Sequence, residues 1–143
     1  RQRQMCIRDS YISNIERGQT PFTPAVGICM QIYQALKMID KLGLEIYLER
    51  IEKKAIDFRA RIGKLPLTIP KYPLSNAITP IIFKKPIAID IFKSLKNEYD
   101  MIVNPTGGVN EDYILRIAHI GSNDFEDQKK LVECICKILV RYE

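Results

Sequence analysis

Arg116 is the residue of this chain whose type and position most strongly suggest binding chemistry. It lies in the run Leu115-Arg116-Ile117-Ala118-His119-Ile120-Gly121, where one arginine interrupts an apolar, β-type segment just before the only histidine. Burying an arginine is costly unless its planar guanidinium is paired, and its best partner is a carboxylate or phosphate held by two parallel hydrogen bonds. Arg116 is therefore a candidate to bind an anionic ligand. The alternative is an internal salt bridge to an acidic side chain of the same chain.

A second candidate for anion binding is the segment Gly18-Gln19-Thr20-Pro21-Phe22-Thr23-Pro24. Thr23 followed by Pro24 is typical of a helix start, with a hydroxyl N-cap and a proline at the first helical position. The N-terminus of a helix presents free N–H groups and the positive end of its dipole, which suits a phosphate. The hydroxyls of Thr20 and Thr23 and the amide of Gln19 could add hydrogen bonds. The alternative is that Thr23 only caps its own helix.

The other reactive side chains predict no catalytic or metal centre. We interpret His119 as a core histidine, and we find no Ser/His/Asp set or carboxylate pair with suitable spacing. The four cysteines are unpatterned, which suggests buried thiols in a reducing compartment. Cys134 and Cys136 lie two apart in a helical pattern, so we expect them on different faces, and we predict no metal site.

The apolar periodicity predicts two helices on the N-terminal side of the chain. The first runs from the Thr23-Pro24 start to about Lys41, ends at Gly43 and is apolar nearly all round, so we expect it to be buried between layers or at a subunit interface. The second runs from about Leu44 to Ile62. Its apolar stripe comprises Leu44, Tyr47, Leu48, Ile51, Ala55, Phe58 and Ile62. Its predicted outer face comprises Glu49, Arg50, Glu52, Lys53, Lys54 and Arg59.

The remaining pattern predicts a small sheet with two further helices. We expect strands at Ile78–Phe83, Met101–Val103 and Tyr113–Ala118, with Pro80 marking an edge or a bulge and Thr106–Gly108 forming a turn. Helices are predicted over Ala88–Asn97 and Asp124–Tyr142. The order of elements indicates an α+β fold, in which a small, largely antiparallel sheet is covered by helices.

Composition and charge exclude several classes of protein. A chain of 143 residues with 46% apolar and 27% charged residues matches an ordinary globular domain. The net charge of +5 includes +2 from residues 1–10, and elsewhere Lys and Arg are interleaved with Asp and Glu. We therefore expect no nucleic-acid partner. Because no segment has the length of a membrane span or of a secretory signal, we expect no membrane partner and a cytoplasmic location.

Residues 1–10 differ in style from the rest of the chain. The sequence does not begin with methionine, and its first ten residues are polar and basic. We interpret them as a non-native or disordered leader that carries no function. The chain is then expected to be a piece of a longer protein.

The two anion-binding candidates together carry a family resemblance. The segments Gly18–Val26 and Leu115–Gly121, about 90 residues apart with these helices between them, resemble the C-terminal portion of class V (fold type I) pyridoxal-phosphate (PLP) aminotransferases. The similarity covers residues 11–143 and is greatest to the alanine–glyoxylate, serine–glyoxylate and 2-aminoethylphosphonate–pyruvate transaminases. The chain differs from this group at Ala118, where glycine is common, at Thr20, where several relatives carry tyrosine, and at Pro105-Thr106.

The resemblance implies a domain organisation and roles for individual residues. Residues 11–43 would be a loop and interface helix from the end of the large domain, and residues 44–143 the C-terminal small domain. Thr20 and Thr23, with Gln19 beside them, would face the cofactor phosphate of the neighbouring subunit in a homodimer. Arg116 would hold the α-carboxylate of an amino-acid or 2-oxo-acid substrate.

The resemblance also implies what the chain lacks. The family uses a lysine that forms a Schiff base with PLP and an aspartate that pairs with the pyridine nitrogen, and both lie upstream of the part that matches. We therefore expect the full-length parent to be a transaminase that acts on pyruvate or glyoxylate, and this fragment to be inactive alone. Two alternatives stay open: a non-catalytic α+β interaction module with a structural Arg116, and a cysteine desulfurase-like class V lyase.

Overall fold

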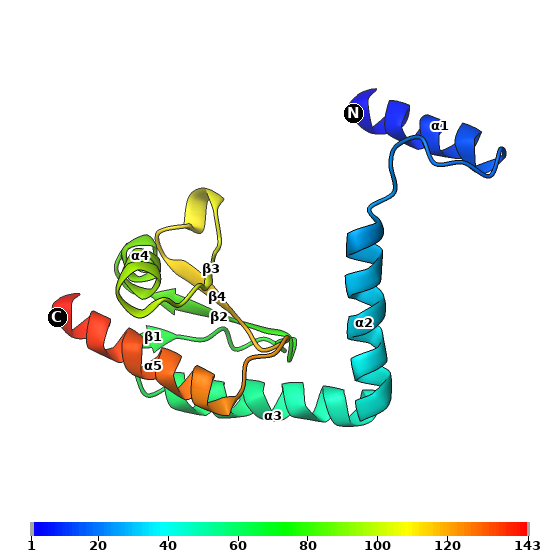
Figure 1. Cartoon of the computed structure of the whole chain (residues 1–143). Helices are drawn as coiled ribbons and strands as arrows, with labels where there is room; N and C mark the ends of the chain where they lie inside the picture. Colours follow the sequence, from blue (N-terminus) through cyan, green and yellow to red (C-terminus); the bar gives the residue numbers. More distant parts are fainter. Residues whose placement is uncertain (1, 143) are drawn as a thin grey trace. The chain divides into compact units, whose positions relative to one another are not determined.

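The computed structural model describes the chain from residue 2 to residue 142, and the side chains from residue 7 onward. The chain divides into two compact units, Arg1–Gly43 and Leu44–Glu143, which are described separately below (Figure 1). The assignment of the first unit to the end of a large domain stays a prediction.

The first unit consists of two helices, α1 (Gln2–Ile15) and α2 (Val26–Leu42). The backbone is helical from Gln2 onward through the predicted leader, whose native or non-native origin stays a prediction. As predicted, α2 ends at Gly43, whose φ of 90° lies in the region that glycine adopts without strain. None of its residues is buried, so its apolar surface has no cover within the described chain.

The predicted start of α2 is wrong by two residues. Val26 N–H donates to Pro24 O over 2.8 Å, and Ala25 has φ −75° and ψ 61°, the geometry of an inverse γ-turn. This turn separates Pro24 from the helix and makes Ala25 the N-cap residue, without a side-chain cap. Thr23 therefore does not cap α2.

The second unit is the predicted α+β fold, a four-stranded antiparallel sheet covered by helices (Figure 1). The strands are β1 (Leu67–Thr68), β2 (Ile78–Phe83), β3 (Asn104–Pro105) and β4 (Ile114–Ala118), in the order β1-β2-β4-β3. The helices are α3 (Leu44–Ile62), α4 (Ala88–Tyr99) and α5 (Phe125–Leu139), with short 3-10 turns η1 (Gly108–Asn110) and η2 (Val140–Tyr142). The predicted bounds of α3 and β2 are confirmed.

The core lies between one face of the sheet and the three helices. Alternate residues of β2 and β4 point into it, because successive side chains of a strand face opposite sides of a sheet. Its fully buried large side chains include Phe58, Ile62, Ile81, Ile91, Leu95, Leu115, Ile135 and Ile138. Leu44 and Leu48, at the first turns of α3, are exposed although the predicted stripe includes them.

Two sequence-based expectations about this unit are wrong, and one holds locally. Met101–Val103 is not a strand; the next residues, Asn104-Pro105, pair with β4 instead. Lys54 is buried rather than on the outer face, because its ammonium donates hydrogen bonds to Asn123. Pro80 pairs with Arg116 of β4 but has no partner on β1, which pairs only with Ile82 and Phe83, so it lies at a local edge of the sheet, as predicted.

This position of Pro80 is compatible with its missing N–H group. Hydrogen bonds between β2 and β4 join Phe83 to Tyr113 and Ala77 to His119, so they fall on the odd-numbered residues of β2. The nitrogen of Pro80 therefore points away from β4. On that side β1 pairs only with Ile82 and Phe83, so no ladder bond is lost.

Candidate functional site

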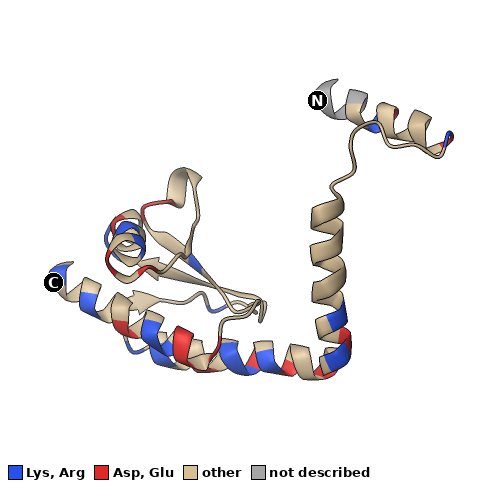
Figure 2. Ribbon diagram, viewed as in Figure 1, with Lys and Arg blue, Asp and Glu red and all other residues tan. Residues whose placement is uncertain are grey.

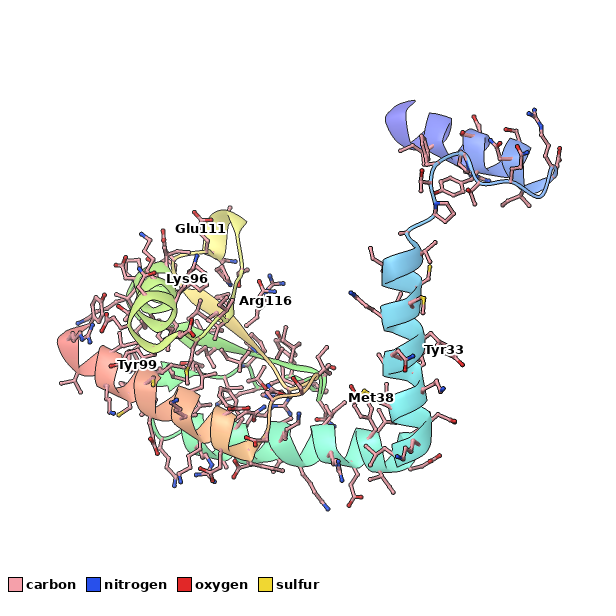
Figure 3. The ribbon with its side chains drawn as sticks, in the orientation of Figure 1. Tyr33, Met38, Lys96, Tyr99, Glu111 and Arg116 are labelled. Atoms are coloured by element: carbon pink, nitrogen blue, oxygen red, sulfur yellow. The ribbon has the colours of Figure 1, made fainter. Side chains whose placement is uncertain are left out.

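Arg116 lies at the centre of β4, on the face of the sheet opposite the core. Leu115 and Ile117 on either side of it are buried against the helices, and strand alternation turns Arg116 the other way. Figure 3 shows its side chain directed away from α3 and α5. In register, Arg116 lies opposite Pro80 on β2 and Asn104 on β3.

The guanidinium of Arg116 is held by neutral groups alone. Its Nη2 donates to Asn104 Oδ1 over 2.9 Å and to Pro105 O over 3.0 Å, while its Nε is buried without a partner. Among the side chains that the structure describes, no carboxylate forms an ion pair with it. The alternative of an internal salt bridge is therefore wrong, and the charge remains available to a ligand.

Arg116 faces an open cleft of about 520 Å³ beside β3 and β4. Among the residues that the structure describes, Arg116 is the only charged one that lines this cleft. Phe92, Ile102 and Leu131 supply apolar walls, and Asn104 and Asn123 supply amides. A cleft with one unpaired cation, apolar walls and polar neutral groups suits a small organic anion.

Asn123, which lines this cleft, forms hydrogen bonds with α3 and with the end of β4. Its Nδ2 donates to Ala118 O over 3.2 Å, and its backbone O and Oδ1 accept hydrogen bonds from Lys54 Nζ over 2.9 and 3.0 Å. Burial lowers the pKa of Lys54, which the nearby carboxylate of Asp124 opposes. These bonds fix the segment that follows β4, directly after the strand that carries Arg116.

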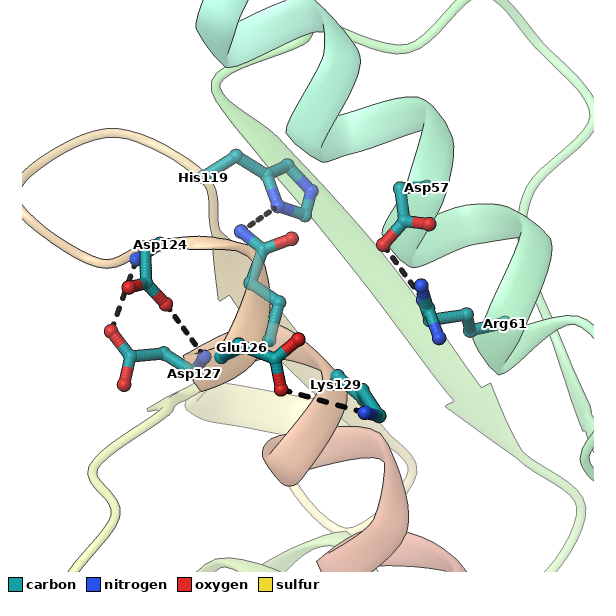
Figure 4. A network of polar contacts seen from close by, with 8 residues as sticks. Asp57, Arg61, His119, Asp124, Glu126, Asp127 and Lys129 are labelled. Atoms are coloured by element: carbon teal, nitrogen blue, oxygen red, sulfur yellow. Dashed lines mark hydrogen bonds and ion pairs between the residues drawn. The ribbon is translucent and has the colours of Figure 1, made fainter.

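His119 occupies the core, as the sequence analysis expects. Its imidazole is fully buried, and Thr79 Oγ1 lies 2.7 Å from its Nε2. Gln128 Nε2 lies 3.0 Å from Nδ1, the contact drawn as a dashed line at His119 in Figure 4. Arg59 Nε donates to the same Thr79 hydroxyl over 2.8 Å. Burial, with smaller contributions from the charges of Arg59 and Lys54, lowers the pKa of His119 to about 4. A neutral imidazole at this place joins β2, β4 and α5.

The residues predicted to face a phosphate lie in the first unit. Gln19, Thr20 and Thr23 are all exposed, and Thr20 Oγ1 donates to Phe22 O over 2.8 Å. The N-terminus of α2 has no side-chain cap and no acidic residue in its first turn. The first turn of α2 thus has no competing carboxylate, which is compatible with a phosphate, whereas the Thr20 hydroxyl proton is already donated to Phe22 O. Arg116 belongs to the other unit. The role of Arg116 in substrate binding and the roles of the three residues of the first unit in phosphate binding stay predictions.

The charged side chains are distributed as the sequence analysis describes. Figure 2 shows Lys and Arg mixed with Asp and Glu along α3 and α5, whereas α2 carries charges only toward its C-terminal end. Among the side chains of residues 7–142, no group of His, Cys, Asp and Glu is arranged to hold a metal ion. None of the described helices is long and apolar enough to span a membrane.

The cysteines only partly follow the expectation of buried thiols. Cys134 is buried and Cys136 is exposed, so these two do point to different faces of α5. Burial raises the pKa of the Cys134 thiol. Cys29 on α2 is exposed, as Cys136 is, so the expectation that the cysteines are buried is wrong for both.

Sequence reasoning did not identify Asn104 as part of the site. Asn104 becomes a neighbour of Arg116 only because β3 pairs with β4 in this register. Its polar side chain in the short segment before the Gly107-Gly108 turn is the one sequence feature that points to a role in the site. The strand predicted at Met101–Val103 leaves Asn104 outside the sheet, whereas β3 begins at Asn104.

Comparisons with known proteins support the fold and the resemblance of the chain to aminotransferases. No family model matches the chain. The chain is 29% identical over 128 residues to the soluble hydrogenase 42 kDa subunit of Anabaena cylindrica, covering 87% of the chain and 32% of that protein. It is also 29% identical over 111 residues to an uncharacterized aminotransferase of Methanocaldococcus jannaschii, covering 74% of the chain and 28% of that protein. The chain thus spans about a third of the length of these relatives.

Two solved structures share the fold. One is an alanine–glyoxylate aminotransferase from Nostoc sp., with a TM-score of 0.68 and 20% identity, covering 74% of this chain and 29% of that one. The other is a phosphoserine aminotransferase from Cytophaga hutchinsonii, with a TM-score of 0.72 and 18% identity, covering 88% of this chain and 36% of that one. The α+β fold matches the C-terminal domains of these aminotransferases, which confirms the predicted resemblance at the level of the fold.

Proposed function

We propose that this chain is the C-terminal portion of a PLP-dependent aminotransferase, in which Arg116 binds the carboxylate of the substrate. The observation that carries the proposal is the guanidinium of Arg116, which lies in a cleft lined by no acidic residue among those described and has a buried, unpartnered Nε. The fold shared with two aminotransferases supports it. A planar carboxylate is the ligand that best matches a guanidinium with free donors.

The proposed reaction moves an amino group between an amino acid, or 2-aminoethylphosphonate, and a 2-oxo acid such as pyruvate or glyoxylate. When bound, PLP supplies the electron sink for this transfer. From this chain, Arg116 would bind and orient the substrate. Gln19, Thr20 and Thr23, with the uncapped amides of α2, would face the cofactor phosphate of the neighbouring subunit. The lysine and aspartate of the family would come from a preceding part of the protein, so the chain alone is expected to be inactive.

The proposal is tested in the longer protein that contains this chain, loaded with PLP. Replacing Arg116 with alanine removes charge-assisted hydrogen bonds to the substrate carboxylate. We expect the KM for the 2-oxo acid to rise about 10- to 100-fold, with cofactor binding nearly unchanged. Arg61→Ala, which removes an arginine paired with Asp57 on α3, is the matched control. Unchanged kinetics in Arg116→Ala would exclude Arg116 from the site.

We also propose that the longer protein is a homodimer that covers α2. Val26, Ile28, Met30, Ile32, Tyr33, Leu36 and Met38 are each more than half exposed on this helix, and Figure 3 labels Tyr33 and Met38. An exposed apolar surface of this kind is typical of an interface. Sedimentation of the chain should show self-association that weakens in Leu36→Glu. A sharply monomeric, cooperatively folding chain would instead favour a free-standing module.

A further inference from the structure

The two hydrogens of Arg116 Nη2 are both engaged within the protein. One points to Asn104 Oδ1 at 2.9 Å and the other to Pro105 O at 3.0 Å. Because a guanidinium only donates, the Asn104 amide must turn its oxygen toward it. The donors that remain on Arg116 are the two hydrogens of Nη1 and the single hydrogen of the buried Nε.

This arrangement conflicts with a two-bond grip on a carboxylate. A guanidinium holds a carboxylate by parallel hydrogen bonds either from Nη1 and Nη2 or from Nε and Nη2. Both modes use Nη2. A bidentate ligand must therefore replace one of the two acceptors that now occupy this nitrogen.

Asn104 is the acceptor that can leave. Pro105 O belongs to the backbone of β3, which pairs with Leu115 of β4, so it moves only if the strand pairing breaks. Asn104 is exposed, and its amide can leave by rotation of the side chain alone. Pro105 O would then continue to hold the guanidinium in place.

We propose that Asn104 is the specificity-determining residue of the Arg116 site, an internal competitor whose amide oxygen occupies the place of a ligand carboxylate oxygen on Nη2. As a neutral group it orders the guanidinium without cancelling its charge, so a fully charged carboxylate displaces it and a weaker neutral acceptor does not. An acidic residue here would close the site by forming an ion pair. The inference rests on the proposed function, because it requires that Arg116 binds a carboxylate.

The test is a titration of the full chain with pyruvate, in which the Nε–Hε NMR signal of Arg116 reports binding. The buried position of Nε protects this proton, and its loss in Arg116→Gln assigns the signal. We expect Asn104→Ala to lower the Kd for pyruvate about 3- to 10-fold, because the competitor is gone. We expect Asn104→Asp to raise it about 10-fold or more, because a charged competitor takes its place.

Opposite directions in the two variants are the signature of a competitor. If Asn104 were a framework residue or a direct ligand of the carboxylate, both variants would weaken binding, and that result would overturn the inference. So would no change in either variant. Asn97→Ala and Asn97→Asp, at an exposed asparagine of α4, make the same changes away from the cleft and should alter the Kd by less than about twofold.

The outcomes also separate this inference from the proposed function. If pyruvate binding depends on Arg116 but the two Asn104 variants change the Kd in the same direction, the proposed function stands and the inference fails. If pyruvate does not perturb the Arg116 signal, both fail. Should Asn104→Ala disturb signals beyond β3 and β4, Asn104→Ser removes the same amide with a smaller change in polarity.

Discussion

Gln128 Nε2 lies 3.0 Å from His119 Nδ1, and both side chains are buried between the sheet and α5. With the amide nitrogen facing the ring, the imidazole proton is assigned to Nε2, which then donates to Thr79 Oγ1 over 2.7 Å. The same hydroxyl accepts a hydrogen bond from Arg59. Burial of the imidazole, and then the charges of Arg59 and Lys54, lower the pKa of His119, whereas its hydrogen bond with Gln128 opposes this change.

The stability of the chain should therefore depend on pH through His119. Its pKa is lowered from 6.5 to about 4 on folding. Between these values the unfolded chain binds a proton that the folded chain does not. The contribution is fully present above the unfolded pKa and is lost as the pH falls from about 6.5 toward about 4. We expect a loss of about 2 kcal/mol in the free energy of unfolding between about pH 7.5 and about pH 5, measured by urea denaturation.

His119→Gln is the control for this prediction. His119 is the only histidine of the chain, so the variant should lose most of the pH dependence in this range while being less stable at every pH. An equally steep dependence in the variant would assign the effect to other groups.

Phe58→Ala should strongly destabilise the second unit. The ring of Phe58 is fully buried, and its centroid lies 5.2 Å from that of His119. Its removal leaves a cavity against the sheet, and we expect a loss of about 3–5 kcal/mol in chemical denaturation. Ile56→Ala, at a side chain of the same helix that is 57% exposed, should cost less than about 1 kcal/mol. Similar losses in both variants would contradict the packing of α3.

Lys54→Ala should cost about 1–3 kcal/mol, because it leaves the backbone O and Oδ1 of Asn123 without their donor. Lys53→Ala is a matched control, because Lys53 is exposed and paired only with Glu49 on the helix surface. It should change the free energy of unfolding by less than about 0.5 kcal/mol. Both are measured by denaturant unfolding at neutral pH, and equal effects would argue against a buried Lys54.

Asp124→Ala should weaken the start of α5. Asp124 accepts a hydrogen bond from Asp127 N–H over 2.9 Å, and the Asp127 carboxylate accepts from Asp124 N–H over 3.0 Å, which together form a capping box. We expect the free energy of unfolding to fall by about 1 kcal/mol, as measured by thermal unfolding. Glu126→Ala removes a carboxylate from the same turn without touching the cap and should have a smaller effect. The reverse order would show that charge, not capping, stabilises this end.

Local patterns predicted the regular elements where one periodicity dominates. The stripe from Leu44 to Ile62 predicted the bounds of α3, because its apolar residues recur with the period of a helix. The short apolar run Ile78–Phe83 predicted β2. The pattern failed at Met101–Val103 and at Thr23. The apolar run Met101–Val103 does not pair with another strand. At the start of α2, a γ-turn at Ala25 replaces the cap expected from Thr23.

The sequence by itself determined that Arg116 lies in a β-type segment, on the side opposite Leu115 and Ile117, and it carried the resemblance to the aminotransferases. Only the tertiary structure decided what surrounds the guanidinium. Its partners, Asn104 and Pro105, come from another strand, and the register that places them beside Arg116 depends on pairing between distant segments. The lack of an acidic partner was decided in the same way, since 17 acidic residues were available in the sequence and the fold brings none of the described ones into an ion pair with Arg116.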